Sequence, residues 1–511
     1  MKQSVIILYL FIMFTACKNN QQQEDTMEAV AAQGDIVNTI LTDKDNFYFI
    51  DFDNYPDDLN SLPVGIFDSG TGGLTVLKAI VNYDEHKNGS GDLGEDGLRD
   101  FNKEAFIYLG DQANMPYGNY AKENKVELLQ EHIIKDAQFL MSNKYYNDGS
   151  DDKANTNKQA VKVIVVACNT ATAYGKEYIE DYLQKAGSNI KVIGVIDAGV
   201  RGALNGIAVD EDAIIGVLAT AGTVASKGYS NTINTLKKQR SYTGNIEVYS
   251  QGGIGIAEAV DEDPDYYDKN IAKPRDGYKG PGLDGEVKID KSLFDVYNFN
   301  FADNRMLCDT EDKTSCSLMQ INDAENYVRY HLVSLMENIR LSKTTNQLKS
   351  IILGCTHYPY LTNELNQVLE ELYNYKTKDG EYVYKDLMAE KITLIDPAVN
   401  TAQELFVHLN NESLFNANGD INNSEFYISV VNDKNSNNII DKNGRFPYDY
   451  KYGRIEGQIQ EYVKVVPFSR KNISADILNR FEQQIPFVYD LMKNYNRNNE
   501  KTQNLKEKEK I

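Results

Sequence analysis

The chain has 511 residues, which is long enough for two or three domains. It carries 53 basic and 75 acidic residues, for a formal net charge of -22. This balance argues against a protein that binds along a nucleic-acid backbone, because such proteins present basic stripes.

The first residues have the pattern of an export signal. A lysine precedes an apolar run at 5–14, and two small residues then lead to Cys17. The run is too short to span a bilayer, but it fits a bacterial lipoprotein signal, whose mature chain begins at a lipidated cysteine. We therefore interpret 1–17 as this signal and 18–61 as a polar tether. The predicted location is the bacterial cell envelope, with a lipid anchor in the membrane, and the alternative is the cytoplasm.

After the tether, apolar runs alternate with helical patterns, which is typical of parallel α/β sheets. Four runs predict the strands of a first half: 64–68, 106–111, 161–167 and 192–196. The pattern then restarts and predicts the strands of a second half: 213–218, 245–249, 350–353 and 392–396. The sequence thus predicts two similar, pseudo-symmetric α/β domains with parallel sheets, and an active site in the cleft between them.

The domain boundaries follow from these patterns. We expect the first α/β domain at 62–197 and the second at 198–394. The charged stretch at 261–323, punctuated by Pro and Gly, predicts an insertion in the second domain. Residues 395–511 are expected to return to the first domain and to add a C-terminal extension, whose last helix covers about 475–495.

Two cysteines stand at the ends of predicted strands. Cys168 follows Val-Ile-Val-Val-Ala, Cys355 follows Ile-Ile-Leu-Gly, and each is expected to precede a helix. Open α/β sheets bind ligands at the carboxyl ends of their strands. Two thiols at two such ends could face each other across a small substrate, and racemisation needs one base on each face. For either cysteine alone, a buried structural role is the alternative.

Two loops could contact the same ligand. The turn at 65–73 contains Asp68 and four glycines, which allow a ligand to approach a helix N-terminus that favours anions. Its spacing fits neither a dinucleotide loop nor a Walker loop. The Pro-Tyr-Gly at 116–118 can place a phenol and a backbone amide near a ligand. An ordinary turn is the alternative in both places.

The remaining cysteines suggest a structural bond. Cys308 and Cys316 lie within the insertion, close enough to form a disulfide that an envelope location would preserve. A zinc site is not expected, because the chain has only five histidines and no CxxC pair.

Together these motifs resemble glutamate racemase, of the aspartate/glutamate racemase superfamily. The resemblance is collinear over about 62–260 and 325–410, and the His357 that follows Cys-Thr favours the glutamate branch. It implies cofactor-independent, metal-free conversion of L-glutamate to D-glutamate for peptidoglycan. In such a two-base reaction, one thiolate removes the α-proton and the opposite thiol returns a proton to the other face.

The resemblance also implies roles for individual residues. Cys168 and Cys355 would be the acid/bases, Asp68 would assist the first, and His357 would assist the second. The substrate-binding set would be Asp68, Ser69, Tyr117, Gly118, Asn169, Thr170, Thr223, Thr356 and His357. Members of the family often pair, so a homodimer is a possible state.

The chain also departs from the family pattern. Asp197-Ala198 stands where the family has Glu-Pro, and 250–258 replaces a Cys-Pro and apolar segment, with Glu258 as a candidate for the family's acidic position. Two alternatives therefore stay open. One is racemisation of aspartate or another amino acid, and the other is a non-catalytic envelope lipoprotein that binds an amino acid. Intact cysteines and their two assistants favour an active enzyme.

Overall fold

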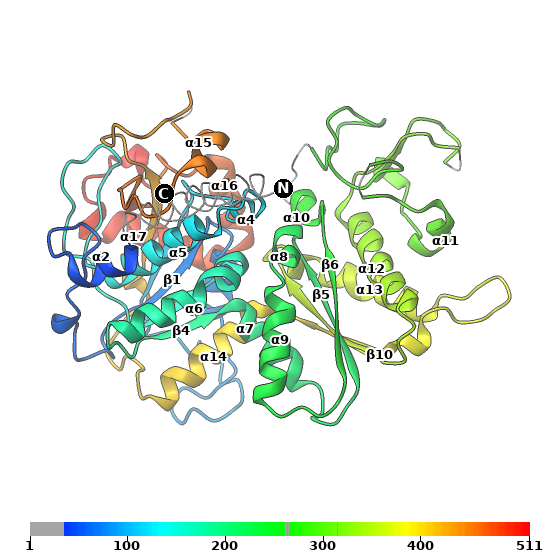
Figure 1. The fold of residues 1–511 in the computed structure, drawn as a ribbon, viewed down its shortest axis with the longest axis horizontal. Helices are drawn as coiled ribbons and strands as arrows, with labels where there is room; N and C mark the ends of the chain where they lie inside the picture. The colour runs from blue at the N-terminus through cyan, green and yellow to red at the C-terminus, as the bar shows by residue number, and fades with distance from the viewer. Residues whose placement is uncertain (1–34, 261–262, 264, 286, 314, 443) are drawn as a thin grey trace, which may run out of the picture.

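The structure, a computed structural model, describes residues 35–511 except 261, 262, 264, 286, 314 and 443. Cys17 and the rest of the predicted signal lie outside the described residues. Two halves lie side by side, and each is built on its own sheet (Figure 1). The predicted mixed α/β fold with parallel sheets is confirmed.

The first half contains a six-stranded sheet in the order β12-β11-β2-β1-β3-β4. Four of its strands pair in parallel: β1 (Val64–Asp68), β2 (Phe106–Gly110), β3 (Val163–Val166) and β4 (Lys191–Gly194). The C-terminal region adds β11 (Glu425–Val431), parallel to β2, and β12 (Val463–Pro467), antiparallel at the edge. Every residue of β1, β2 and β3 is buried, because helices cover both faces of the sheet.

The second half contains a four-stranded sheet in the order β10-β9-β5-β6. Its strands are all parallel: β5 (Ala213–Ala219), β6 (Ile246–Gly252), β9 (Leu348–Gly354) and β10 (Met388–Ile395). In chain order, the first strand of each half is central, the second lies on one side of it, and the third and fourth lie on the other. The order β2-β1-β3-β4 is therefore repeated as β6-β5-β9-β10, which gives the pseudo-symmetry a concrete form.

Helices surround both sheets. Those of the first half are α2 (Ile36–Thr42), α3 (Leu74–Val81), α4 (Gly118–Lys122), α5 (Val126–Met141), α6 (Asn169–Lys185), α15 (Tyr448–Gly453), α16 (Ala475–Gln484) and α17 (Pro486–Asn498). Those of the second half are α8 (Ala221–Ala225), α9 (Gly228–Gln239), α10 (Ile256–Val260), α11 (Phe294–Tyr297), α12 (Ala324–Leu341) and α13 (Thr362–Asn374). None of the described helices is long and apolar enough to cross a membrane.

The chain passes between the halves twice, through α7 (Val195–Asn205) and α14 (Pro397–Asn411). These two helices pack closely; in Figure 1, α7 lies between the halves and α14 runs beneath the first half. A Cβ at Gly202 would come within 2.4 Å of the Asn400 side chain, so a larger residue there would have to displace this side chain. The two crossings thus form one packed hinge region beneath the cleft.

Two predicted segments differ from the structure. Residues 35–61, predicted as part of the tether, contain α2 and bury Ile40, Tyr48 and Ile50 against the first half. These apolar side chains are few, but they cover a face of α5 that would otherwise contact water. The expected last helix is two helices, α16 and α17, because Pro486 cannot continue the hydrogen-bonding ladder.

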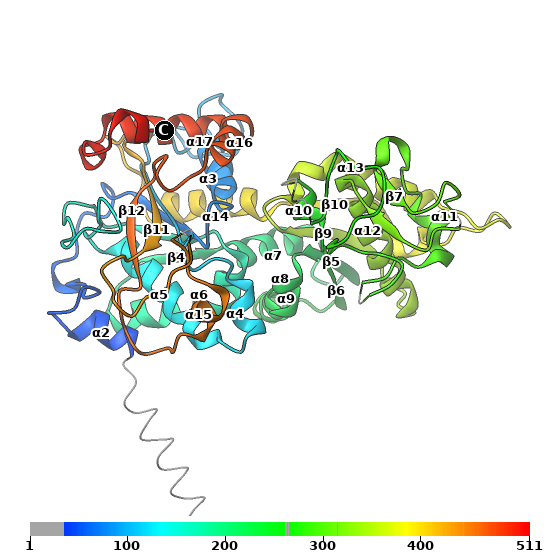
Figure 2. The ribbon, with the colours of Figure 1, turned by 90° about the horizontal axis from the view of Figure 1, so that it is seen from above.

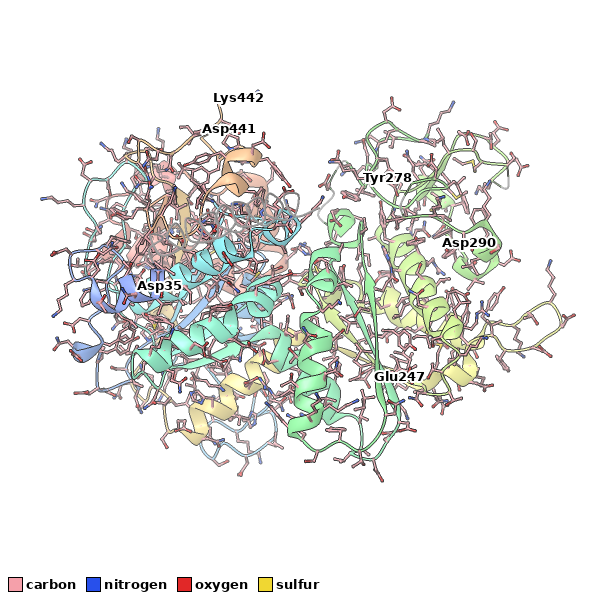
Figure 3. The ribbon with its side chains drawn as sticks, viewed as in Figure 1. Asp35, Glu247, Tyr278, Asp290, Asp441 and Lys442 are labelled. Atoms are coloured by element: carbon pink, nitrogen blue, oxygen red, sulfur yellow. A yellow bond between two sulfur atoms is a disulfide. The ribbon has the colours of Figure 1, made fainter. Side chains whose placement is uncertain are left out.

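The insertion packs on α12 of the second half. Tyr278 and Asp290, which Figure 3 labels, belong to the insertion. It contains a two-stranded antiparallel sheet of β7 (Met306–Cys308) and β8 (Met319–Ile321). The predicted disulfide joins Cys308 to Cys316, whose Cα atoms are 5.6 Å apart. This bond closes the loop between the two short strands.

Candidate active site

The candidate site begins where the first sheet reverses its strand order. β1 connects to β2 on one side, and β3 lies on the other, so the carboxyl ends of β1 and β3 flank a crevice that binds ligands in such sheets. Asp68 ends β1, and Cys168 follows β3 after Ala167. The same position in the second sheet lies between the ends of β5 and β9, where Thr223 and Cys355 stand.

Cys168 is the N-cap of α6. Its sulfur accepts the Ala171 N–H at 3.4 Å and lies 3.7 Å from the Ser69 hydroxyl oxygen. Asp68 accepts the N–H groups of Gly73 and Gly70 at 3.0 and 3.2 Å. The glycine-rich turn thus fixes the carboxylate beside the thiol.

The protonation state of Cys168 is decided by competing influences. A helix N-terminus favours a thiolate. Burial disfavours the charge more strongly, and the Asp68 carboxylate adds to this, so the pKa of the Cys168 thiol is raised to about 12. Burial also raises the pKa of Asp68. Cys168 therefore holds its proton at neutral pH.

Cys355 has different partners. It follows β9 but precedes a short 3-10 helix (Tyr358–Leu361), and α13 begins only afterwards. Both cysteines therefore precede helical segments, as expected, but the segment after Cys355 starts as a 3-10 turn that contains Pro359. His357 Nδ1 lies 3.6 Å from the Cys355 sulfur and 3.5 Å from the Thr356 hydroxyl oxygen. The imidazole can therefore exchange a proton with this thiol.

Three contacts bring the two halves together at these loops. A Cβ at Gly72 would lie 3.4 Å from Thr356 Oγ1 and 3.6 Å from Asp68 Oδ2, so Thr356 of the second half reaches the glycine-rich turn of the first. A Cβ at Gly222 would lie 3.5 Å from the Cα of Gly118. The third contact is a hydrogen bond between Tyr229 and Asn169.

Tyr229 of α9 donates a hydrogen bond to Asn169 Oδ1 across the cleft, at 2.8 Å. Because the amide oxygen is thus occupied, the Asn169 amide nitrogen keeps its two N–H donors for another partner. Sequence reasoning missed Tyr229. The available signal was its place six residues after Thr223, in the helical segment that follows β5.

Both free thiols are almost fully buried, with 7% of Cys168 and 8% of Cys355 exposed. The two thiols therefore differ in their neighbouring side chains and not in their burial. Between the halves lies a cavity of about 230 Å³, whose walls include Asn169 from the first half and Cys355 and Thr356 from the second, whereas Cys168 does not line it. The remaining predicted residues lie at the same loops: Thr170 in the first turn of α6, and Thr223 in α8 behind its cap Thr220.

One predicted contact is not formed. The Tyr117 phenol does not point toward the cleft, because its oxygen lies 2.6 Å from both Asp111 Oδ2 and Asp136 Oδ2 within the first half. Only the backbone of the Pro-Tyr-Gly loop, at Gly118, reaches the second half. The Tyr117 side chain therefore anchors the loop to the first half and does not contact the cleft.

The two departures from the family pattern also have definite surroundings. Lys176 Nζ lies 3.6 Å from Asp197 Oδ1, so this carboxylate is ion-paired. Glu258 accepts the Gly255 N–H at 3.0 Å. Burial raises the pKa of Glu258, and the nearby His357 opposes this rise. Glu258 is therefore a carboxyl group within electrostatic reach of His357.

One group of potential metal ligands occurs among the described residues, namely Cys308, Asp309 and Cys316. Both of its sulfurs are joined in the disulfide, and it lies in the insertion. This group therefore offers no thiolate to a metal ion.

The chain is similar in sequence to known glutamate racemases. No family model matches the chain. It is 31% identical over 212 residues to glutamate racemase of Sulfurihydrogenibium sp.. These residues make up 42% of this chain and 62% of the relative, so the match spans less than two thirds of the relative's length. It is 23% identical over 376 residues to glutamate racemase of Lactobacillus helveticus, covering 74% and 91% of the two chains. The crystal structure of glutamate racemase from Francisella tularensis with D-glutamate aligns over 72% of this chain and 89% of that one, with 22% identity and a TM-score of 0.40. The sequence relatives support the racemase family.

Proposed function

We propose that this protein is a glutamate racemase that interconverts L- and D-glutamate by a cofactor-independent two-base reaction. The observation that carries the proposal is the pair of free, buried thiols at equivalent strand ends of two matching sheets. The substrate would lie in the cleft, with one thiol at each face of its α-carbon.

The different partners of the thiols give them different starting states. Cys168 carries its proton, because burial and Asp68 raise its pKa to about 12, and so it is the acid of the resting enzyme. Cys355 lies beside the His357 imidazole, which can accept its proton and make it the base. In the reverse reaction Cys168 takes the α-proton, and the two roles exchange.

The site must also hold the substrate and stabilise the developing carbanion. The free N–H donors of Asn169, the Ser69 and Thr356 hydroxyls, and the N-terminus of α6 offer donors to the carboxylates of glutamate. Burial of both thiols excludes water, which strengthens these interactions at the moment of proton transfer.

The proposal is tested by following optical activity with purified protein and L- or D-glutamate as substrate. We expect each enantiomer to approach the racemic mixture without added cofactor. L- and D-aspartate in parallel reactions test the alternative substrate, and we expect them to react more slowly. Binding of glutamate without any change in optical activity would instead favour the non-catalytic lipoprotein.

We further propose that the enzyme is attached to the bacterial envelope through lipid on Cys17 and supplies D-glutamate for peptidoglycan. The support is the sequence before residue 18, where an apolar run and two small residues precede Cys17. Mass spectrometry of the mature N-terminus should find a lipidated cysteine. An unmodified Met1 on protein from the cytoplasm would reject the anchor. A homodimer, carried over from the resemblance, is tested by light scattering of the solubilised protein.

A further inference from the structure

A group of buried acids lies behind the Pro-Tyr-Gly loop. Asp111 follows β2, Asp136 is on α5, and Tyr117 precedes α4. The Tyr117 oxygen lies 2.6 Å from one oxygen of each carboxyl group. The three residues are 1%, 6% and 1% exposed for Asp111, Asp136 and Tyr117, so water does not separate them.

This geometry requires an additional proton. A phenol has one hydrogen and can donate to only one carboxylate. Two ionised carboxylates at this distance would leave one oxygen facing another with no hydrogen between them. A proton on one carboxyl group removes this conflict, because that group then donates to the phenol oxygen and the phenol donates to the other.

The surroundings indicate which acid holds the proton. Asp111 also accepts hydrogen bonds from the Asn114 amide at 3.0 and 3.1 Å and from the Ser429 hydroxyl at 2.6 Å. These donors stabilise its ionised form. Within the described residues, the side-chain hydrogen bond recorded for Asp136 is the one with Tyr117. Asp136 is therefore the protonated partner.

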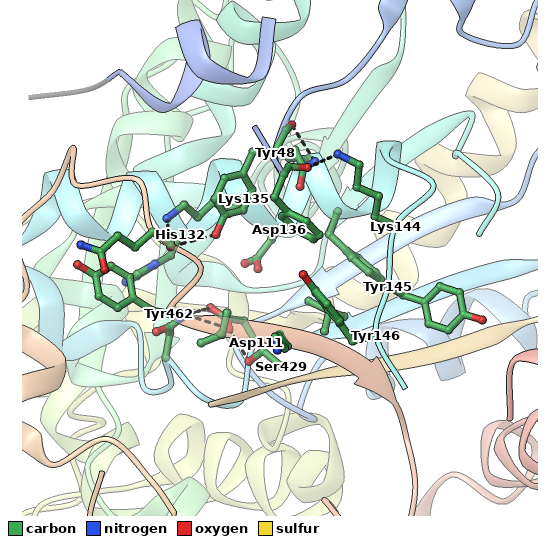
Figure 4. A pocket seen from close by; sticks show the side chains of 18 residues that line it. Tyr48, Asp111, His132, Lys135, Asp136, Lys144, Tyr145, Tyr146, Ser429 and Tyr462 are labelled. Carbon is green, nitrogen blue, oxygen red and sulfur yellow. Dashed lines mark hydrogen bonds between the residues drawn. The ribbon is translucent and has the colours of Figure 1, made fainter. Parts of the chain in front are cut away.

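The charges around Asp136 agree with this assignment. Burial raises the pKa of Asp136 well above its usual range and Asp111 and Asp68 raise it further, whereas the hydrogen bond with Tyr117 and the charge of Lys135 oppose this rise. The Lys135 charge is already compensated by Glu131, which lies 2.6 Å from it. Asp136 also lines a small cavity of about 40 Å³ shown in Figure 4, and the titratable side chains on the walls of that cavity are Tyr48, Asp111, His132, Lys135, Lys144, Tyr145, Tyr146, Tyr462 and Lys464.

The shared proton is connected to the cleft through the backbone. Gly118 follows Tyr117 directly and lies against Gly222 of the second half, next to Thr223. The Tyr117 ring is held in the first half by its two acids, so it fixes where this backbone meets the second half. Release of the phenol would free the loop that borders the substrate.

We propose that Asp136 and Asp111 share one proton through Tyr117 and are positioning residues for the Pro-Tyr-Gly loop of the racemase cleft. The kinetic consequence rests on the proposed function, whereas the shared proton does not. When Asp136 loses its proton at alkaline pH, two carboxylates oppose one phenol, and the loop loses its anchor.

The test compares an isosteric variant with a truncated one. In Asp136→Asn, the side-chain amide is a neutral donor to the phenol at every pH, so it imitates the protonated acid. We expect KM for glutamate to rise at alkaline pH in the wild type and to stay flat in Asp136→Asn over the same range. Asp136→Ala should raise KM about tenfold at all pH values with a smaller change in kcat, as expected when one buried hydrogen bond is lost. Asp181→Asn, an exposed site on α6, is the matched control and should follow the wild type.

A second readout does not depend on racemisation. The infrared difference spectrum of wild type minus Asp136→Asn, recorded in deuterated water at neutral pH, should contain a protonated-carboxyl band, and the spectrum of wild type minus Asp181→Asn should not. Absence of this band from the first difference spectrum would overturn the shared proton, whether or not the protein racemises glutamate. An alkaline rise in KM that persists in Asp136→Asn would overturn the positioning role.

Discussion

The two thiol sites occupy the same place in two matching sheets, yet they have different chemistry. Cys168 and Cys355 each follow the third strand of their half, and they are buried to the same extent. Cys168 caps a helix of 17 residues beside a carboxylate, whereas Cys355 precedes a 3-10 turn beside an imidazole. The fold therefore sets where each thiol lies, and the nearest side chains set what it does.

This difference matches the need of a two-base reaction for one acid and one base at the start of each turnover. A carboxylate next to a buried thiol keeps the thiol protonated, while an imidazole next to a thiol can accept its proton. In enzymes, two titratable groups whose surroundings separate their pKa values commonly serve as the acid and the base. The predictions below test whether the two sites act as distinct but equally necessary partners.

The largest expected effect is removal of either thiol. Cys168→Ala and Cys355→Ala should each lower kcat for racemisation by a factor of about 10³ to 10⁴, as expected for loss of a general acid or base. The measurement is the change in optical activity from both enantiomers. Near-normal racemisation in either variant would show that one site suffices. The control is the double variant Cys308→Ser/Cys316→Ser, which removes the disulfide of the insertion and should leave kcat unchanged.

The second prediction concerns the assistants, Asp68 and His357. Asp68→Asn and His357→Asn should each lower kcat/KM by about 10²-fold, equally in both directions, because the two enantiomers of glutamate have the same free energy. The asymmetry should appear in the isotope effect with α-deuterated substrate. We expect a larger isotope effect for one enantiomer in Asp68→Asn and for the opposite enantiomer in His357→Asn. An increase for the same enantiomer in both variants would contradict the assignment of one assistant to each thiol.

The third prediction concerns the hydrogen bond that joins the halves. Tyr229→Phe removes the donor to Asn169, so the amide is free to rotate away from the substrate. KM for glutamate should rise about tenfold with a smaller change in kcat, in line with one lost hydrogen bond. Tyr242→Phe is the control, because its hydroxyl bonds backbone oxygens of Leu204 and Ile207 in the second half. Equal KM values for the two variants would remove Tyr229 from the site.

The fourth prediction, and the smallest difference in practice, is the alkylation rate of each thiol. The pKa of Cys168 is raised, so its neutral form persists from acid up to about pH 12 and its thiolate forms only near that value. Between pH 7 and 9, iodoacetamide should label Cys355 severalfold faster than Cys168, because the thiolate is the reactive species and the raised pKa of Cys168 keeps that thiol neutral. Peptide mapping by mass spectrometry measures both rates. Equal labelling would show that Asp68 and burial do not hold the Cys168 proton.

Much of the fold was accessible from the sequence because the strands are buried on both faces. Their β-branched runs mark the strands directly, and each cysteine at the end of such a run lies at the carboxyl edge of a sheet. The disulfide of the insertion was also predictable from spacing. Residues 35–61 were harder, because their polar composition hides the few apolar side chains that pack against α5.

Contacts between distant segments account for the rest of the site. The direction of the Tyr117 phenol depends on Asp136, which is 19 residues away on another helix. The Tyr229 bond to Asn169 joins α9 to α6 across 60 residues and forms only when the two halves are folded. The break between α16 and α17, in contrast, depends on a local signal, because Pro486 alone marks it in the sequence.

Solvent exchange in the single thiol variants tests the two-base assignment most directly. Purified Cys168→Ala and Cys355→Ala are incubated in deuterated water with L-glutamate or D-glutamate, and α-deuterium is measured by mass spectrometry after separation of the enantiomers. Each variant keeps one thiol on one face of the substrate. We predict that each exchanges the α-proton of one enantiomer without racemisation, and that the two variants act on opposite enantiomers. Exchange of both enantiomers by a single variant, or of the same enantiomer by both, would contradict a thiol on each face.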